Sequence, residues 1–247
     1  MNRRHLFLAG LALLALWQGV AMLVHQPILP PPTEVGAVLW QEVRNGSLGG
    51  HFLASLWRVV ASTLLAILTA APVGLILGQS RRLNAFFAPV IYLLYPIPKV
   101  VFVPVVLLFL GIGDLSKIVV IYLILFFQVL VLVRDQAAGL RPELILSVRS
   151  LGAGRLALFR FVYLPASLPA ILTALRQSIG TAVAVLYVAE LFATQKGLGY
   201  YIYLNGSALL NYPAMYAGVV AMSVLGLGLY FLVDGLEKRW CRWQTAA

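Results

Sequence analysis

Charged residues are few in this sequence, and cysteine is almost absent. Only 11% of the 247 residues are Asp, Glu, Lys or Arg, whereas 62% are hydrophobic and the mean hydropathy is +0.94. A water-soluble domain is about half apolar and a quarter charged, so a soluble enzyme, a disordered tail and a coiled coil are excluded. Cys241 is the sole cysteine, which excludes a disulfide scaffold. The composition predicts a membrane protein.

Two chemical signatures are also missing from the sequence. No G-x-x-x-x-G-K-[ST] loop is present to cradle the phosphates of a nucleotide. His5, His25 and His51 have no metal-like spacing with Cys241. We therefore expect no metal and no catalytic residues.

Acidic residues are scarcer than basic ones, with eight Asp and Glu against eighteen Lys and Arg and a net charge of +10. In a soluble protein this excess would suggest a nucleic-acid partner. In a membrane protein, basic residues instead collect on the cytoplasmic side. We therefore expect no nucleic acid and use the basic residues to predict the topology.

Long hydrophobic runs are what the sequence has in abundance. A hydrocarbon core of about 30 Å requires roughly 20 apolar residues per helix. The runs predict an all-α polytopic membrane protein with six transmembrane helices. These helices are expected at residues 6–24, 52–78, 86–110, 118–133, 171–192 and 214–233.

The start of the chain has two interpretations. Arg3 and Arg4 before an apolar run resemble a secretory or twin-arginine signal. No A-x-A cleavage pattern precedes His25, and the run is long enough to span a bilayer. The first span is therefore predicted to be an uncleaved anchor.

The distribution of basic residues predicts that both termini are cytoplasmic. With the N-terminus inside, the outer loops contain only Arg44, Lys117 and Lys196 as basic residues. In the first outer loop, Thr33 is expected to cap a surface helix over residues 33–43. No repeat or soluble segment is apparent, so residues 1–247 are predicted to form one permease-type membrane domain with its core at about 52–236.

The longest cytoplasmic segment, about 134–164, is predicted to hold a helix, a bend and a second helix. Pro142 and Glu143 suit the first turn of a helix. Gly152 provides a stop or a sharp bend, and Pro165 and Pro169 are expected to break the chain before the next span. Such an element rests on lipid headgroups or docks on a cytoplasmic partner.

The same segment resembles the coupling loop of binding-protein-dependent ABC importer permeases, which reads E-A-A, then a glycine, then I-x-L-P. Gly152 matches the glycine, and Val162, Leu164 and Pro165 match the tail. The first triplet is Leu-Ser-Val at 146–148, so the usual glutamate is missing. Further segments look like the nitrate/sulfonate/taurine branch of that family, namely residues 30–60, 96–99 with Pro104, 111–117 and 197–200.

The resemblance implies a type I ABC importer permease in the bacterial inner membrane. Such a subunit moves a small solute into the cytoplasm by alternating access, here an oxoanion such as a sulfonate, taurine or nitrate. It has no cofactor of its own, because ATP is bound by the partner subunit. The implied partners are two cytoplasmic ABC ATPase subunits, a second permease copy in a homodimer and an external solute-binding protein.

The resemblance also implies which residues couple the permease to the ATPase. Gly152 is the residue on which this prediction depends most, because a side chain there would separate the two surfaces or forbid the bend. The predicted coupling residues are Glu143, Leu146, Ser147, Val148, Arg149, Leu151, Gly152, Leu156, Phe159, Val162, Leu164 and Pro165.

Other functions stay open at this point. A permease of the same family could carry a thiamine-precursor pyrimidine or another vitamin. A secondary transporter would explain the spans but not the cytoplasmic bend. A membrane-embedded enzyme would require clustered nucleophiles and acids at one depth, which the sequence does not show.

Small and charged residues inside the spans are the remaining candidates. Ala70, Gly74 and Gly78 form a small-x-x-x-small face, which packs within the chain or against a second permease copy. Lys99 follows Pro96 and Pro98, which with Pro104 are expected to interrupt the third span and line a pathway.

Arg176 and Glu190 are further candidates for the pathway. Fourteen residues at 1.5 Å each separate them by about 21 Å along one helix, so each requires another partner. An interhelical role is the alternative for both. Arg58 is expected to anchor the outer interface, and Asp114 and Lys117 are expected to form a surface pair.

Overall fold

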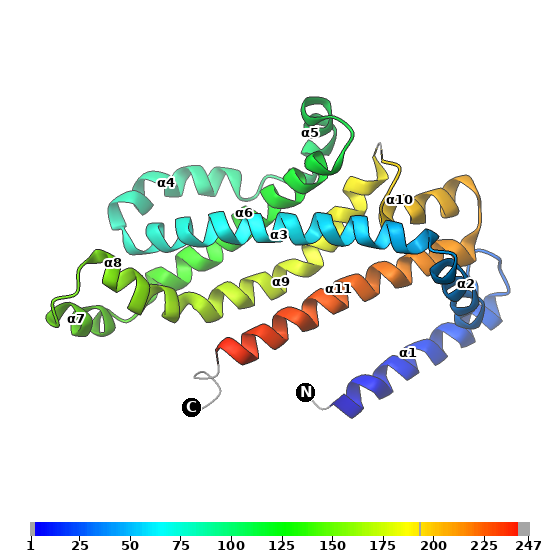
Figure 1. Ribbon diagram of the computed structural model, residues 1–247, viewed down its shortest axis with the longest axis horizontal. Coiled ribbons are helices and arrows are strands. Elements are labelled where there is room, and N and C mark those ends of the chain that lie inside the picture. The colour runs from blue at the N-terminus through cyan, green and yellow to red at the C-terminus, as the bar shows by residue number, and fades with distance from the viewer. Residues whose placement is uncertain (1–2, 193, 242–247) are drawn as a thin grey trace. The chain divides into compact units, whose positions relative to one another are not determined.

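The structure is a computed structural model that describes residues 3–192 and 194–241, and every regular element in these residues is a helix. The chain falls into two compact units. Unit 1 comprises the described residues of Met1–Leu56 and Glu190–Leu225, and unit 2 those of Trp57–Ala189 and Gly226–Ala247. Three long helices contribute to both units, α3 (Ser47–Gln79), α9 (Leu164–Leu191) and α11 (Tyr212–Trp240) (Figure 1).

Five helices in the described residues are long and apolar enough to cross a bilayer, judged by length and composition. A sixth span is present if the bent pair that follows α3 is one span. The predicted helical class and number of spans are therefore confirmed. The five continuous spans are Phe7–Val24 within α1 (Arg3–Val24), α3, α6 (Asp114–Ala138), Leu156–Leu191 and α11.

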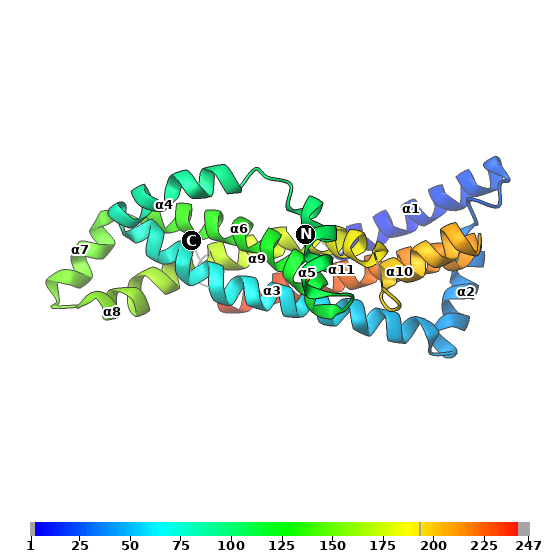
Figure 2. The same cartoon turned by 90° about the horizontal axis from the view of Figure 1, so that it is seen from above.

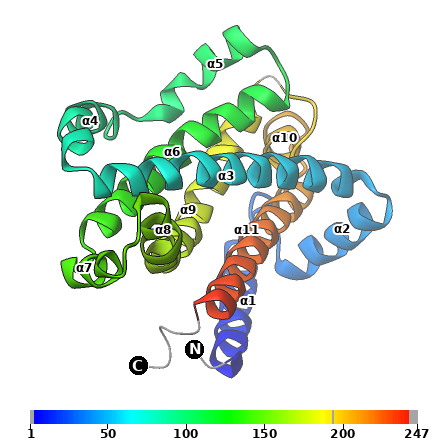
Figure 3. The ribbon, with the colours of Figure 1, turned by 60° about the vertical axis from the view of Figure 1, so that its left-hand side comes forward.

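The third span is broken near its middle, as the prolines predict. Helix α4 (Arg81–Leu94) ends before Pro96 and Pro98, and the chain bends by 73° before η1 (Lys99–Phe102) and α5 (Val103–Leu110) (Figure 3). The predicted interruption at Pro104 is wrong. Pro104 lies in the first turn of α5, where its missing N–H removes no intrahelical hydrogen bond.

The predicted break at Pro165 and Pro169 is also wrong. The short helix α8 (Arg155–Leu158) continues through a π-turn, η2 (Phe159–Tyr163), into α9, and Pro169 lies inside α9. At this π-turn the N–H of Leu164 donates to the carbonyl of Phe159. Wider turns of this kind let a membrane helix absorb a proline without ending.

Unit 1 contains α1, α2 (Pro32–Arg44), α10 (Leu198–Tyr203) and η3 (Leu204–Ala208), with the adjoining parts of the long helices (Figure 2). The helix predicted after the proline run, over residues 33–43, is present as α2. Its N-cap is Pro31 rather than Thr33, and no side chain caps it. Trp17 of α1 packs against Tyr216 of α11 with tilted rings, 5.6 Å between the centroids.

The small residues of α3 explain how unit 2 packs. Ala70 is fully buried, and an added Cβ at Gly74 would lie 2.9 Å from the carbonyl oxygen of Leu130 in α6. At Gly78 the Cβ would lie 2.5 Å from the carbonyl oxygen of Arg134. The stripe predicted to pack therefore lies against α6 of the same chain, at near contact of the two backbones.

This close approach makes Gly78 sensitive to the smallest substitution. We expect Gly78→Ala to lower the stability of the solubilised chain by about 2 kcal/mol, because the methyl group meets the backbone of α6, which cannot yield locally. Thermal unfolding in detergent measures the loss. Gly180→Ala in α9 is the matched control, since nothing lies within 4 Å of its added Cβ. Equal stability of the two variants would contradict the close contact.

Candidate functional site

The segment predicted to bend does so at Gly152. Helix α7 (Pro142–Ser150) begins with Pro142 in its first turn, as expected, and α8 follows after the turn. Gly152 has φ +80°, a left-handed conformation that L side chains rarely adopt. We call residues 142–165 the α7–α8 element.

A small apolar core holds the two helices of this element together. Leu158, Val162 and Tyr163 are buried there, and the partly buried Ile145 and Val148 pack against them. These apolar contacts join α7 to the start of the long helix that begins at α8. The element is thus a small folded unit with its own core rather than a loose linker.

The element also exposes large apolar side chains. Leu146 is 62% exposed, Leu151 84% and Leu156 81%. Among the other predicted coupling residues, Val162 is buried and Val148 and Phe159 are half-buried, so these three shape the element instead of meeting a partner directly. The exposed remainder consists of Glu143, Ser147, Arg149, Gly152, Leu164 and Pro165.

The element lies at the end of unit 2 where α3 ends and α4 begins, as Figures 1 and 2 both show. A cavity of about 420 Å³ lies between the α7–α8 element and the connection from α3 to α4. Gln79 and Ser80 line one side of the cavity, and Arg149 and Tyr163 line the other. The element therefore lies next to the end of α3 and the start of α4.

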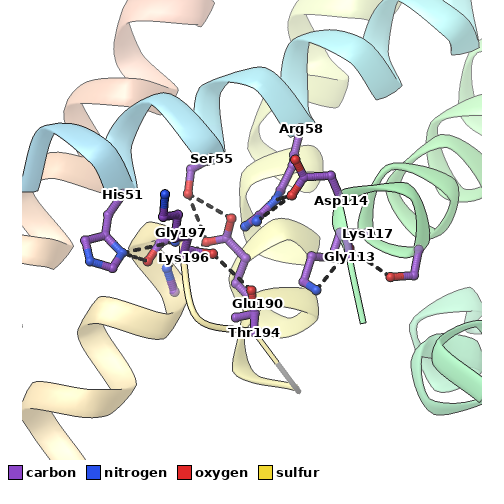
Figure 4. Close-up of polar contacts among 12 residues, drawn as sticks. His51, Ser55, Arg58, Gly113, Asp114, Lys117, Glu190, Thr194, Lys196 and Gly197 are labelled. Atoms are coloured by element: carbon purple, nitrogen blue, oxygen red, sulfur yellow. Dashed lines mark hydrogen bonds and ion pairs between the residues drawn. The ribbon is translucent and has the colours of Figure 1, made fainter. Parts of the chain in front are cut away.

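A buried carboxylate organises the loop after α9 in unit 1. Glu190 is fully buried and accepts hydrogen bonds from Ser55 Oγ, at 2.8 and 2.9 Å to its two oxygens, and from the N–H of Gly199 at 2.8 Å (Figure 4). Ser55 Oγ in turn accepts from the N–H of Leu198 at 2.8 Å. His51 Nδ1 lies 3.1 Å from both the N and the O of Gly197.

Sequence reasoning found Glu190 but missed Ser55 and His51. Both lie on α3, four residues apart and on one helix face, where His51 meets Gly197 and Ser55 meets the next residue, Leu198. Two polar residues with helical spacing at the start of an apolar run are the signal that could have found them.

Two predicted surface groups are buried in unit 2. Arg58 is 3% exposed, and its Nε and Nη2 donate to Asp114 Oδ1 at 2.8 and 2.7 Å (Figure 4). Lys117 is 1% exposed and donates to the carbonyl of Gly113 at 3.1 Å. The predictions of an interfacial anchor at Arg58 and of a surface pair between Asp114 and Lys117 are therefore wrong. The apolar surroundings favour pairing inside the protein over exposure to lipid.

Arg176 has partners on another helix, as its distance from Glu190 required. Its Nη1 lies 3.0 Å from Asp234 Oδ1 and 3.2 Å from Glu237 Oε2, both in α11. Thr173 Oγ1 also donates to Glu237, at 2.9 Å. This cluster joins α9 to α11 within unit 2.

Lys99 lies at the break of the third span. Its Nζ donates to the carbonyl oxygens of Leu94, Tyr95 and Ile97 at 2.8, 3.0 and 3.2 Å. These are backbone groups that the end of α4 leaves without helical partners. The ammonium also lies 4.5 Å from the ring centroid of Phe127 in α6.

Among the described residues, no three His, Cys, Asp or Glu side chains come together in a way that could hold a metal ion. The polar groups described above instead join helices and loops. The α7–α8 element exposes apolar side chains near the connection from α3 to α4. Together with the candidate spans, this arrangement defines a multi-pass membrane protein.

The comparisons with known proteins agree with this class. Residues 54–242 match the family of binding-protein-dependent transport system inner membrane components. The taurine transport system permease protein TauC of Escherichia coli (strain K12) is 32% identical, over 94% of this chain and 86% of that protein. The riboflavin transport system permease protein RibX of Chloroflexus aurantiacus is 31% identical, over 95% and 88%.

A solved structure supports the fold. A chain of the MetNI methionine ABC transporter, in inward-facing conformations, superposes with a TM-score of 0.70 at 21% identity, over 78% of this chain and 95% of that one. The chain belongs to the family of binding-protein-dependent transport system inner membrane components, which confirms the resemblance. It is an ABC importer permease in the inner membrane, and not an enzyme.

The Glu190 network yields a stability prediction. Ser55→Ala removes the single hydroxyl proton that the two oxygens of the buried carboxylate share, and it removes the acceptor of the Leu198 N–H. We expect a loss of about 2 kcal/mol in thermal unfolding of the detergent-solubilised chain. Ser223→Ala is the control, because its exposed hydroxyl bonds only back to the carbonyl of Val219. A loss no greater than that of the control would show that the network does not hold the loop.

Proposed function

We propose that this permease imports a small oxoanion, such as a sulfonate or taurine, and that ATP hydrolysis by partner subunits drives it through the α7–α8 element. The observation that carries the proposal is the outward apolar face of that element, with Leu146, Leu151 and Leu156 exposed around a left-handed Gly152. Apolar side chains exposed beside a charged rim fit a groove on a protein partner.

The partners follow from the family. Two cytoplasmic ATPase subunits, a second copy of this chain and an external solute-binding protein complete the transporter in this proposal. Both termini and the α7–α8 element then lie in the cytoplasm, in keeping with the basic residues. Residues 1–247 act as one permease domain, with its core at about 52–236.

The physical demand on the α7–α8 element is large. Moving a two-state pathway from 1:99 to 99:1 requires about 5.5 kcal/mol of differential binding between the two states. In this proposal, closure of the ATPase pair supplies that energy through the element. In this proposal its own apolar core keeps α7 and α8 together while they transmit the change.

The solute is argued from charge and from the relatives. The taurine permease TauC favours a sulfonate, and Lys99 places a positive charge at the break of the third span. We infer that Lys99 faces the translocation pathway. Arg176 and Glu190 hold interhelical and loop contacts, and a part in the pathway stays a prediction for both.

A vitamin or a pyrimidine precursor is the second candidate for the solute. The observation that favours it is the riboflavin permease RibX, whose identity to this chain is nearly that of TauC.

Substitution of Gly152 tests the coupling. We expect Gly152→Leu to insert into the membrane normally, yet to abolish solute uptake and weaken copurification of the ATPase. A side chain at φ +80° strains the turn by about 1–2 kcal/mol and adds bulk to the outer face. The assay is uptake into vesicles that contain the full transporter.

Gly154→Leu is the matched control for this test. It adds the same side chain two residues further on, where no left-handed conformation is required and nothing lies within 4 Å of an added Cβ. Normal uptake by Gly152→Leu would contradict the coupling role, and equal loss in both variants would show that bulk alone matters.

Reconstitution tests the solute class. The permease, its ATPase and the cognate binding protein are placed in proteoliposomes, and ATP hydrolysis is measured with taurine, ethanesulfonate, nitrate, riboflavin or a thiamine-precursor pyrimidine. We expect the sulfonates to stimulate hydrolysis several-fold. Stimulation by riboflavin or the pyrimidine alone would replace the oxoanion with the second candidate.

A further inference from the structure

A cavity of about 360 Å³ lies beside the broken third span in unit 2. Tyr95, Pro98 and Lys99 line it on the side of the break, and Phe127 and Gln128 of α6 line the other side. Small-molecule sites in proteins occupy about 300–1,000 Å³, with few polar groups among apolar walls. The cavity is therefore large enough for a small solute.

The charge of the cavity has one sign. Of the described residues that line it, Lys99 alone is charged. The three carbonyl oxygens around its ammonium are neutral dipoles, so they solvate the charge without cancelling it. A cation in a low-dielectric region with no carboxylate beside it favours the entry of an anion.

Gln128 supplies a hydrogen-bond acceptor, in contrast to the donor Lys99. Its Oε1 is buried and has no hydrogen-bond partner among the described residues. A buried acceptor without a donor costs about 1–3 kcal/mol, which a ligand that donates a hydrogen bond would recover. Ile124, Phe127 and Val185 form the apolar wall of the same cavity.

These three features suit one class of ligand. We propose that the cavity binds the transported solute during translocation, as a small molecule with an anionic group at one end and a hydrogen-bond donor at the other. The anionic group lies at Lys99, where it replaces the longest of the three ammonium contacts, 3.2 Å to Ile97 O. The donor meets Gln128 Oε1, and the chain between them lies on Phe127.

An aminoalkanesulfonate has this pattern, whereas an alkanesulfonate has the anionic group but not the donor. The inference rests on the proposed import of an oxoanion and assigns the residues that would select it. A site built to accept a donor discriminates against the analogue without one, because its buried acceptor is then left unpaired.

Cysteine labelling tests the charge of the cavity. In the full-length Cys241→Ser chain in membrane vesicles, Val100→Cys places one thiol on the cavity wall. We expect the anionic sulfonatoethyl methanethiosulfonate to react faster than the cationic trimethylammonioethyl reagent. Adding Lys99→Met should lower the ratio of the two rates about tenfold, and Lys99→Arg should preserve it.

A bound solute should shield Val100→Cys from labelling, which tests whether the solute's hydrogen-bond donor meets Gln128. We expect taurine to slow labelling of Val100→Cys more than ethanesulfonate does, and Gln128→Leu to remove that difference. Gln136→Leu is the matched control, because it makes the same change at an exposed position of α6.

The outcomes separate the cavity from the proposed function. An unchanged rate ratio in Lys99→Met, equal protection by both sulfonates, or no labelling by either reagent would overturn the cavity site. None of these results requires ATPase or binding protein, so stimulated hydrolysis by taurine can still succeed when the cavity assay fails. If Lys99 serves only to bond the backbone carbonyls at the end of α4, Lys99→Met would change the rates of both reagents by the same factor and leave their ratio unchanged.

Discussion

The absence of water from the bilayer interior is the constraint on which this structure depends. A backbone or charged group that is not satisfied inside the protein costs several kcal/mol there. Lys99 meets that demand where Pro96 and Pro98 end α4, because its ammonium takes three carbonyl oxygens that no helix can bond. At the break of the third span a polar side chain supplies these bonds, whereas at the π-turn η2 the backbone supplies its own.

The same constraint connects packing to function. Gly74 and Gly78 bring the backbone of α3 almost into contact with that of α6, so these two helices of unit 2 pack closely. The C-terminal end of α3 and the α7–α8 element line the same cavity. In the proposed transporter, a force on that element would reach α3 beside this cavity, whereas the broken third span at Lys99 is where the chain can provide a polar lining.

Much of the fold could be predicted from the sequence, because bilayer thickness sets the length of each apolar run. The charged side chains could not be predicted as well. Arg58 and Lys117 were expected at the surface and are buried, since their partners depend on tertiary contacts that spacing does not encode. Pro169 was expected to break the chain before the span, but it lies inside α9, which continues through it. Gly152 was identified from its motif, and its left-handed backbone agrees with that prediction.

The central claim is that the α7–α8 element faces the cytoplasm, where an ATPase can act on it. Single cysteines in the Cys241→Ser chain test this directly, with Ser150→Cys in the element and Asn45→Cys at the end of α2, both at exposed positions. In right-side-out vesicles, a membrane-impermeant maleimide should label Asn45→Cys and leave Ser150→Cys unlabelled until the membrane is opened. Labelling of Ser150→Cys in sealed vesicles would contradict the account.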